Sequence, residues 1–302
     1  MIEEARGRID YDECGAGPSI VLVPGSCSTG AAWRPVIAAW ENRFRCVTTS
    51  LPGYGGTTER RTALDTSISH NAEAIESVIR MAGGHVHLVG HSFGGLVALA
   101  VALRNRVSLA SLVMVEAPAV GVLREEVQHY RTFRQMTDAY FADFERGNPE
   151  AIAAMIDFYG GPGTYAGWPS RVRAYAAATT PVNILDWASG YGFPLPAATL
   201  ATIEIPLLIV RGGESPQAMQ RASALVSERT RGSTLATIDG AAHFMIATHA
   251  SAVAGLIAEH AYQAEARQNI PVWCSLRKRR GGHDTLPKQE KSRLPAGPSC
   301  SR

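Results

Sequence analysis

Short apolar runs that alternate with helical stretches constrain most strongly how this chain of 302 residues can fold. Most of the runs lack polar alternation and end at turn-forming residues, as residues 19–23 end at Pro24-Gly25. Strands of this kind are buried on both faces, which predicts an α/β domain around a mostly parallel sheet flanked by helices. The expected strands are 19–23, 44–49, 86–89, 109–115, 206–210 and 234–238. The expected helices are 31–40, a helix from 65 or 67 to 81, 95–103, 216–226 and 245–262.

The alternation stops between residues 117 and 196. This segment has helical stretches and many aromatic residues, but no convincing strand pattern. Alternation then resumes with residues 206–210. We therefore predict a helical cap at 117–196, inserted into a core domain made of residues 1–116 and 197–263.

Residues 264–302 differ in composition from the rest of the chain. Nine of the 29 Lys and Arg residues lie between Ala266 and Arg302, together with only two of the 27 Asp and Glu residues. The segment is rich in Pro, Gly and Ser and shows no apolar periodicity, which predicts a basic disordered tail. Such a tail could bind nucleic acid or anionic lipid. The abrupt change in composition favours an appended segment instead, so we expect no nucleic-acid partner and assign the tail no catalytic role.

The pentapeptide Gly90-His91-Ser92-Phe93-Gly94 lies between a predicted strand and a predicted helix. A Gly-x-Ser-x-Gly sequence in that setting is typical of a nucleophile elbow, a sharp turn that exposes the serine hydroxyl at the end of a strand. The helix that follows offers backbone N–H groups to a developing oxyanion. A glycine-rich connection with an ordinary serine would give the same letters, but the flanking elements favour Ser92 as a nucleophile.

With this motif in this setting, the sequence resembles the α/β-hydrolase superfamily, in its capped esterase and lipase branch. The resemblance covers residues 8–260 and rests on three further segments. Each departs from the family's usual residue at one position: Pro24 replaces a histidine, Ser50 an aspartate and Ala242 a glycine. The segments are Val23-Pro24-Gly25-Ser26 followed by Trp33, Leu51-Pro52-Gly53-Tyr54-Gly55, and Gly240-Ala241-Ala242-His243-Phe244.

A serine hydroxyl needs a base, and histidine suits this task because it titrates near neutrality. Among the nine histidines, His243 follows the last predicted strand on a loop at the sheet's carboxyl edge, where the sites of α/β proteins form. His91 adjoins Ser92 but is expected to pack beneath it. We predict His243 as the base.

The acid that orients this histidine is less evident. The resemblance places an aspartate after the penultimate strand, where this chain has Ser215, and a serine cannot stabilise an imidazolium as a carboxylate does. Glu116 ends the strand after the elbow helix, and some members of the superfamily carry their acid there. Glu116 is therefore the predicted acid. Glu214 is the alternative, and Asp239 is interpreted as a turn former.

The resemblance also implies an oxyanion hole made by the backbone N–H groups of Phe93 and Ser26. The aromatic cap suggests an apolar pocket, with Trp33 and Trp168 as candidate lining residues. No dinucleotide motif, phosphate-binding loop or metal-ligand cluster is visible, so no cofactor and no metal are expected.

These features predict a carboxylesterase-like serine hydrolase that acts on a small-molecule ester through an acyl-serine intermediate. A lactonase, thioesterase, carbon–carbon hydrolase or haloperoxidase would use the same residues, and a ligand-binding protein derived from a hydrolase is a further alternative.

The chain shows no signal sequence and no run long enough to span a membrane. Its five cysteines have no metal-type spacing, and a cytoplasmic protein is expected. The sequence leaves the oligomeric state open.

Overall fold

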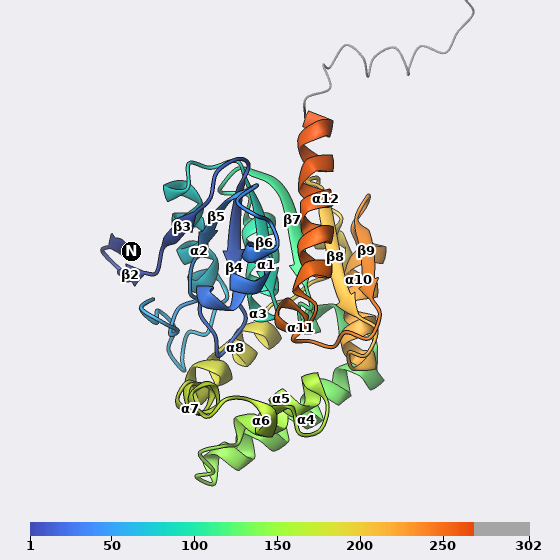
Figure 1. Cartoon of the computed structure of the whole chain (residues 1–302). Coiled ribbons are helices and arrows are strands. Elements are labelled where there is room, and N and C mark those ends of the chain that lie inside the picture. Colours follow the sequence, from blue (N-terminus) through green and yellow to red (C-terminus); the bar gives the residue numbers. More distant parts are fainter. Residues whose placement is uncertain (269–302) are drawn as a thin grey trace, which may run out of the picture. The chain divides into compact units, whose positions relative to one another are not determined.

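A seven-stranded sheet forms the centre of the computed structural model, which describes residues 1–268 (Figure 1). Its strand order is β3-β5-β4-β6-β7-β8-β9. Only β3 runs antiparallel to its neighbour β5, and the remaining pairs are parallel. The strands are β3 (Asp12–Cys14), β4 (Ser19–Val23), β5 (Arg45–Thr48), β6 (Val86–His91), β7 (Leu109–Val115), β8 (Leu207–Gly212) and β9 (Thr234–Ile238).

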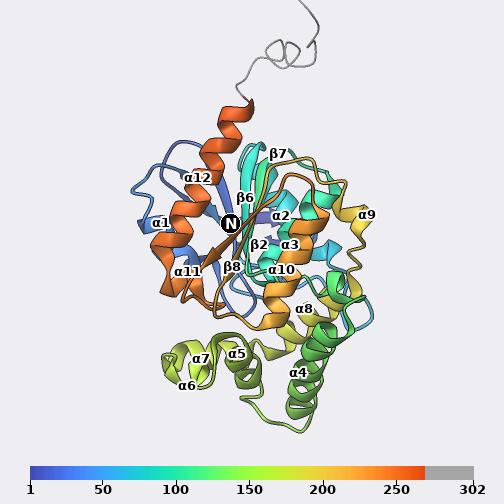
Figure 2. The same ribbon diagram turned by 90° about the vertical axis from the view of Figure 1, so that its right-hand side faces the viewer.

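Helices cover both faces of this sheet, as the uninterrupted apolar strands predict. Along β4, Val21 and Val23 belong to one buried cluster while Ile20 and Leu22 belong to another, because successive side chains point to opposite faces. Figure 2 shows the two helical layers on either side of the strands. The first cluster is covered by α2 (Ser69–Met81), α3 (Phe93–Arg104) and α10 (Gln217–Arg229), and the second by α1 (Arg34–Ala38), α11 (Met245–Thr248) and α12 (Ala250–Gln268). The predicted α/β fold class is confirmed.

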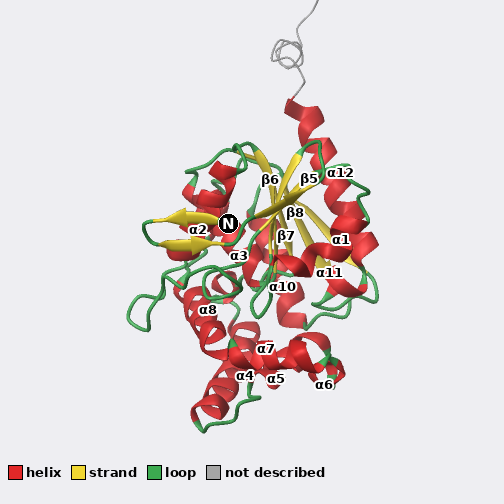
Figure 3. Cartoon of the chain, turned by 60° about the vertical axis from the view of Figure 1, so that its left-hand side comes forward, coloured by secondary structure: helices red, strands yellow, loops and turns green. Residues whose placement is uncertain are grey.

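Apart from the short 3₁₀-helix η1 (Gly30–Trp33), which precedes α1, the additional helices lie between β7 and β8, and Figure 3 shows α4 to α8 gathered beside one end of the sheet. The helices from η2 to α8 fall within residues 117–196, for which a helical cap is predicted, whereas α9 lies in the part predicted to belong to the core domain. Aromatic side chains form much of its interior, including Phe133 and Trp187, whose ring centroids lie 6.0 Å apart. The helices are η2 (Val120–Leu123), α4 (Val127–Glu145), α5 (Ile152–Gly160), α6 (Thr164–Gly167), α7 (Ser170–Ala178), α8 (Thr180–Gly192) and α9 (Ala197–Leu200).

Two ends of the described chain differ from the sequence-based expectation. A hairpin of β1 (Ile2–Glu4) and β2 (Gly7–Ile9) precedes the sheet, and strands of three residues are too short to give a periodic signal. The predicted helix 245–262 is divided at His249 into α11 and α12. Helix α12 also continues past Tyr262, because the small side chains of Ala261 and Ala264 extend its buried face.

The predicted tail at 264–302 begins inside this last helix, and its residues from 269 onward lie outside the described residues. Within residues 1–268, no helix is both long and apolar enough to cross a membrane.

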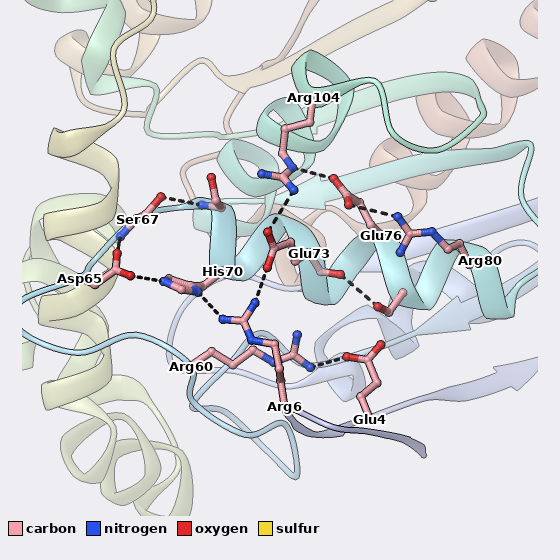
Figure 4. A network of polar contacts seen from close by, with 12 residues as sticks. Glu4, Arg6, Arg60, Asp65, Ser67, His70, Glu73, Glu76, Arg80 and Arg104 are labelled. Carbon is pink, nitrogen blue, oxygen red and sulfur yellow. Dashed lines mark hydrogen bonds and ion pairs between the residues drawn. The ribbon is translucent and has the colours of Figure 1, made fainter.

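Charged side chains join the N-terminal hairpin, α2 and α3 in one network (Figure 4). Glu76 on α2 is almost fully buried and accepts hydrogen bonds from Arg104 of α3 at 2.7 Å and from Arg80 at 3.2 Å. Glu73, one turn earlier, is paired with Arg104 and with Arg6 of the hairpin turn. The network therefore fixes the helix that covers the sheet beside the elbow helix α3.

Candidate active site

Ser92 lies in a strained turn between β6 and α3. Its φ of 53° and ψ of −131° are unusual for a residue with a side chain. The turn is tight enough that a Cβ at Gly94 would lie 2.2 Å from the carbonyl oxygen of Pro24, so only glycine fits there. Ser92 is therefore placed at the end of β6 with its hydroxyl directed out of the sheet, as in a nucleophile elbow.

A chain of two hydrogen bonds connects Ser92 to a buried carboxylate. Glu116 Oε2 lies 3.2 Å from Nδ1 of His243, and Nε2 of His243 lies 2.9 Å from Ser92 Oγ. Because an ionised carboxylate only accepts, Nδ1 carries the proton and Nε2 is free to accept the serine proton. The structure thus brings Ser92, His243 and Glu116 together in the order that a catalytic triad requires.

Glu116 reaches this position from the end of β7. Its backbone has a φ of 51°, and its N–H donates to Val210 of the neighbouring strand β8 at 2.8 Å. The second carboxylate oxygen accepts the N–H of Gly212 at 2.7 Å, which fixes the side chain. Among the other carboxylates considered, Glu214 and Asp239 are exposed to solvent. Ser215 is buried at the place where the resemblance implies an acid.

The loop after β4 lies directly against Ser92. A Cβ added to Gly25 would lie 2.8 Å from Ser92 Cβ, so the backbone there can approach closely only because residue 25 is glycine. Ser26 follows immediately, and Phe93 is the first residue of α3. The two backbone N–H groups predicted for an oxyanion hole thus belong to residues that adjoin Gly25 and Ser92.

His91 packs beneath the site rather than in it. It is buried, and its Nε2–H donates to the carbonyl oxygen of His243 at 2.8 Å. Burial, together with the nearby imidazole of His243, lowers the pKa of His91 from 6.5 to about 3. His91 is therefore neutral at physiological pH and supports the loop that carries His243.

A cavity of about 570 Å³ opens above Ser92 and His243. Its walls are mainly apolar and come from both the core and the cap. The size and character are those of a site for a small organic molecule. Lining side chains include Leu96, Val120, Ile156, Trp168, Trp187 and Phe244.

A family model described as "Alpha/beta hydrolase family" matches residues 20–256. This chain belongs to the α/β-hydrolase family. The match includes all three residues of the hydrogen-bonded chain and the whole cap.

The names of proteins similar to this chain differ in the substrate that they give. The chain is 30% identical over 118 residues to the pimeloyl-[acyl-carrier protein] methyl ester esterase of Aeromonas hydrophila, a match that covers 39% of this chain and 45% of the esterase. It therefore spans less than half the length of that relative. The (E)-2-((N-methylformamido)methylene)succinate hydrolase of Acinetobacter baylyi is 23% identical over 254 residues, covering 78% of this chain and 87% of the relative.

A solved structure of a hydrolase from Pseudomonas aeruginosa PA01 superimposes with a TM-score of 0.69 at 19% identity. The superposition covers 86% of this α/β hydrolase and 96% of that chain, and at this identity it supports the shared fold.

Of the two residues predicted to line the pocket of this α/β hydrolase, one does and one does not. Trp168 lines the cavity, but Trp33 does not. Trp33 is fully buried in the cluster between the sheet and α1, and its ring meets His91 edge to face at 6.4 Å. The prediction was wrong because Trp33, at the end of the 3₁₀-helix η1, packs into the core cluster, whereas Ala31 and Ala32 of the same helix line the cavity.

Two residues of the site were not predicted from the sequence. Tyr159 of α5 stacks on His243 with ring centroids 4.1 Å apart. Asp186 of α8 lines the cavity and accepts a hydrogen bond from the Ser26 hydroxyl. Nothing in the sequence distinguishes Tyr159 from the many other aromatic residues of the cap. Asp186 could have been noticed, because it is the only charged residue in α8.

Proposed function

We propose that this α/β hydrolase is a carboxylesterase-like serine hydrolase that cleaves carboxylic ester-type bonds through an acyl-serine intermediate. The observation that carries the proposal is the chain Ser92–His243–Glu116, with distances of 2.9 and 3.2 Å, at the floor of an apolar cavity. Nucleophile, base and orienting acid are the three parts that acyl transfer to a serine needs.

In the proposed reaction, His243 Nε2 takes the proton of Ser92 as Oγ attacks the ester carbonyl. The carbonyl oxygen becomes negative in the tetrahedral intermediate, and the backbone N–H groups of Ser26 and Phe93 stabilise it. His243 then gives the proton to the leaving alcohol, which leaves the acyl group on Ser92. A water molecule, deprotonated by the same nitrogen, attacks the acyl-serine; the bond to Ser92 Oγ then breaks, His243 returns the proton to Oγ, and the acid is released.

The cavity indicates the kind of ester. Its volume suits a small to medium substrate, and aromatic and aliphatic side chains from the cap, such as Trp168 and Ile156, favour an apolar acyl or alcohol group. The name of the Aeromonas relative, a methyl ester esterase, is consistent with this class of bond.

The test is hydrolysis of p-nitrophenyl acetate, butyrate and hexanoate by the wild type and by Ser92→Ala. Wild type should hydrolyse all three, and a fluorophosphonate probe should label Ser92. Ser92→Ala should lose hydrolysis and labelling while it keeps its melting temperature. Ser251→Ala, which removes an exposed hydroxyl on α12, should behave as wild type. Labelling at another residue, or hydrolysis that survives Ser92→Ala, would overturn the proposal.

A further inference from the structure

The cap places a buried carboxylate next to the loop of the oxyanion hole. Asp186 of α8 is 2% exposed. Its Oδ2 accepts two hydrogen bonds from the core domain, from Ser26 Oγ at 2.5 Å and from the Tyr54 hydroxyl at 2.6 Å. Its Oδ1 accepts a third from Arg61 at 2.7 Å. Nothing in the proposed triad uses this group.

The surroundings keep Asp186 in one orientation. Burial raises its pKa, while Arg61, Ser26 and Tyr54 act in the opposite direction by stabilising the charged form. The Arg61 side chain is itself fully buried and is held by Glu59 through contacts of 2.7 and 2.9 Å. A buried ion pair contributes little net stability, so its geometry is its more informative property.

The loop that Asp186 holds is strained. Cys27, directly after Ser26, has a φ of 56°, a left-handed conformation that costs free energy for a residue with a Cβ. Such a conformation persists only where surrounding contacts enforce it. On one side of Cys27, the Ser26 hydroxyl is bound by Asp186 of the cap. Gly25, which precedes Ser26, lies against Ser92.

We propose that Asp186 is a positioning residue: through the Ser26 side chain, the cap helix α8 sets the direction of the Ser26 backbone N–H toward the oxyanion. This inference rests on the proposed function. The side chain and the N–H belong to one residue, so fixing the hydroxyl limits rotation of the adjacent peptide. The oxyanion hole is thus completed across the boundary between core and cap.

Ser26→Ala is the most direct variant, because it keeps the backbone N–H and removes only the tether. Loss of a complete oxyanion-hole donor lowers kcat by about 10²–10³-fold. In Ser26→Ala the donor remains but is no longer fixed, so only part of this loss of kcat is expected. We expect kcat to fall about 10–50-fold with KM changed less than threefold. Ser26→Thr keeps a hydroxyl and should recover most of the lost kcat.

Ser111→Ala is the matched control. It removes another buried serine hydroxyl, which lies 2.9 Å from Nδ1 of His87 within the sheet and contacts neither Asp186 nor the triad. Its melting temperature should fall about as much as that of Ser26→Ala, but its kcat should stay within threefold of wild type. Asp186→Asn should also lower kcat. The double variant with Ser26→Ala should have a kcat no lower than that of the poorer single variant, because both changes remove the same interaction between Asp186 and Ser26.

An alkyl trifluoromethyl ketone distinguishes positioning from general structural damage. Ser92 adds to this ketone to give a tetrahedral adduct that places an oxyanion in the hole. Its inhibition constant should rise in Ser26→Ala by the same factor by which kcat/KM falls, whereas inhibition by the product acid should not change.

The outcomes separate the two proposals. If wild type hydrolyses no ester, or Ser92→Ala retains activity, the proposed function fails. If Ser92→Ala is inactive but Ser26→Ala keeps kcat and ketone affinity within twofold of wild type, only the role of Asp186 is overturned. Additive losses in the double variant would also overturn it. Should Asp186→Asn fail to fold, the comparison of Ser26→Ala with Ser111→Ala decides alone.

Discussion

The ring of Tyr159 lies over the imidazole of His243, with centroids 4.1 Å apart and planes inclined by 21°. Tyr159 belongs to the cap helix α5, whereas His243 follows β9 in the core. The cap therefore covers one face of the proposed base. An aromatic face stabilises a cation, so this contact favours the imidazolium that forms whenever His243 takes a proton.

Replacing Tyr159 should affect the proposed base more than substrate binding. Tyr159→Phe keeps the ring and is expected to retain kcat within about twofold. Tyr159→Leu removes an aromatic contact worth about 0.5–1.5 kcal/mol, so kcat should fall about 2–10-fold. Steady-state kinetics on p-nitrophenyl butyrate measures both. Equal losses in the Phe and Leu variants would show that the hydroxyl matters and the stacking does not.

The two candidate acids predict opposite rankings of two variants. Glu116→Gln should lower kcat by up to about 10⁴-fold with little change in KM, because the amide cannot hold His243 in the required tautomer or stabilise its charge. Glu214→Gln should be mild, because Glu214 is exposed. Circular dichroism and melting curves should show both variants folded. A small loss of kcat in Glu116→Gln combined with a large loss in Glu214→Gln would assign the acid to the loop after β8.

His91 makes the stability of the fold depend on pH. Its pKa is about 3 in the folded state and near 6.5 when unfolded, so below pH 6.5 the unfolded chain binds a proton that the folded chain does not. The free energy of unfolding should therefore fall as the pH falls from about 6.5 toward 3. Between pH 7.5 and 5.5 the loss due to His91 is about 1.4 kcal/mol.

His91→Gln keeps a donor for the carbonyl of His243 and removes the titration. Urea unfolding at the two pH values should show wild type losing about 1.4 kcal/mol more than the variant. The same loss in both proteins would mean that other groups cause the acid sensitivity.

Glu76 should stabilise the fold without affecting catalysis. Glu76→Gln removes the more buried of the two carboxylates paired with Arg104, a side chain that is 2% exposed, so we expect a loss of about 1–3 kcal/mol. The control is Glu125→Gln, since Glu125 pairs with Arg229 at 81% side-chain exposure and should contribute less than about 0.5 kcal/mol. Urea unfolding measures both. A loss in kcat of folded Glu76→Gln would contradict this separation.

The sequence predicts those parts of the molecule that depend on neighbours along the chain. Six of the seven strands of the sheet were predicted because their side chains are apolar over most of their length, whereas the exposed β3 was missed. Ser92, Glu116 and His243 each follow a strand at the same edge of the sheet, where parallel strands bring such positions together. Glu214 follows a strand as well, so the resemblance to the superfamily was needed to prefer Glu116.

Contacts across the fold were not predictable in this way. Asp186 and Ser26 lie 160 positions apart, and no local pattern reports which cap residue reaches which core loop. Trp33 was misplaced for the same reason: a tryptophan near the site can face the cavity or the core, and only the orientation of its short helix decides which.

The position of Asp186 bears on how enzymes of this design diversify. Glu116 precedes the inserted helices and His243 follows them. The cap of another protein could therefore replace the segment between β7 and β8 with the proposed triad left intact. Such a chimaera would nevertheless lack the carboxylate that binds Ser26 and Tyr54. We therefore expect lid exchange to yield correctly folded but slow enzymes, until an acidic side chain is restored at the equivalent place on the new lid.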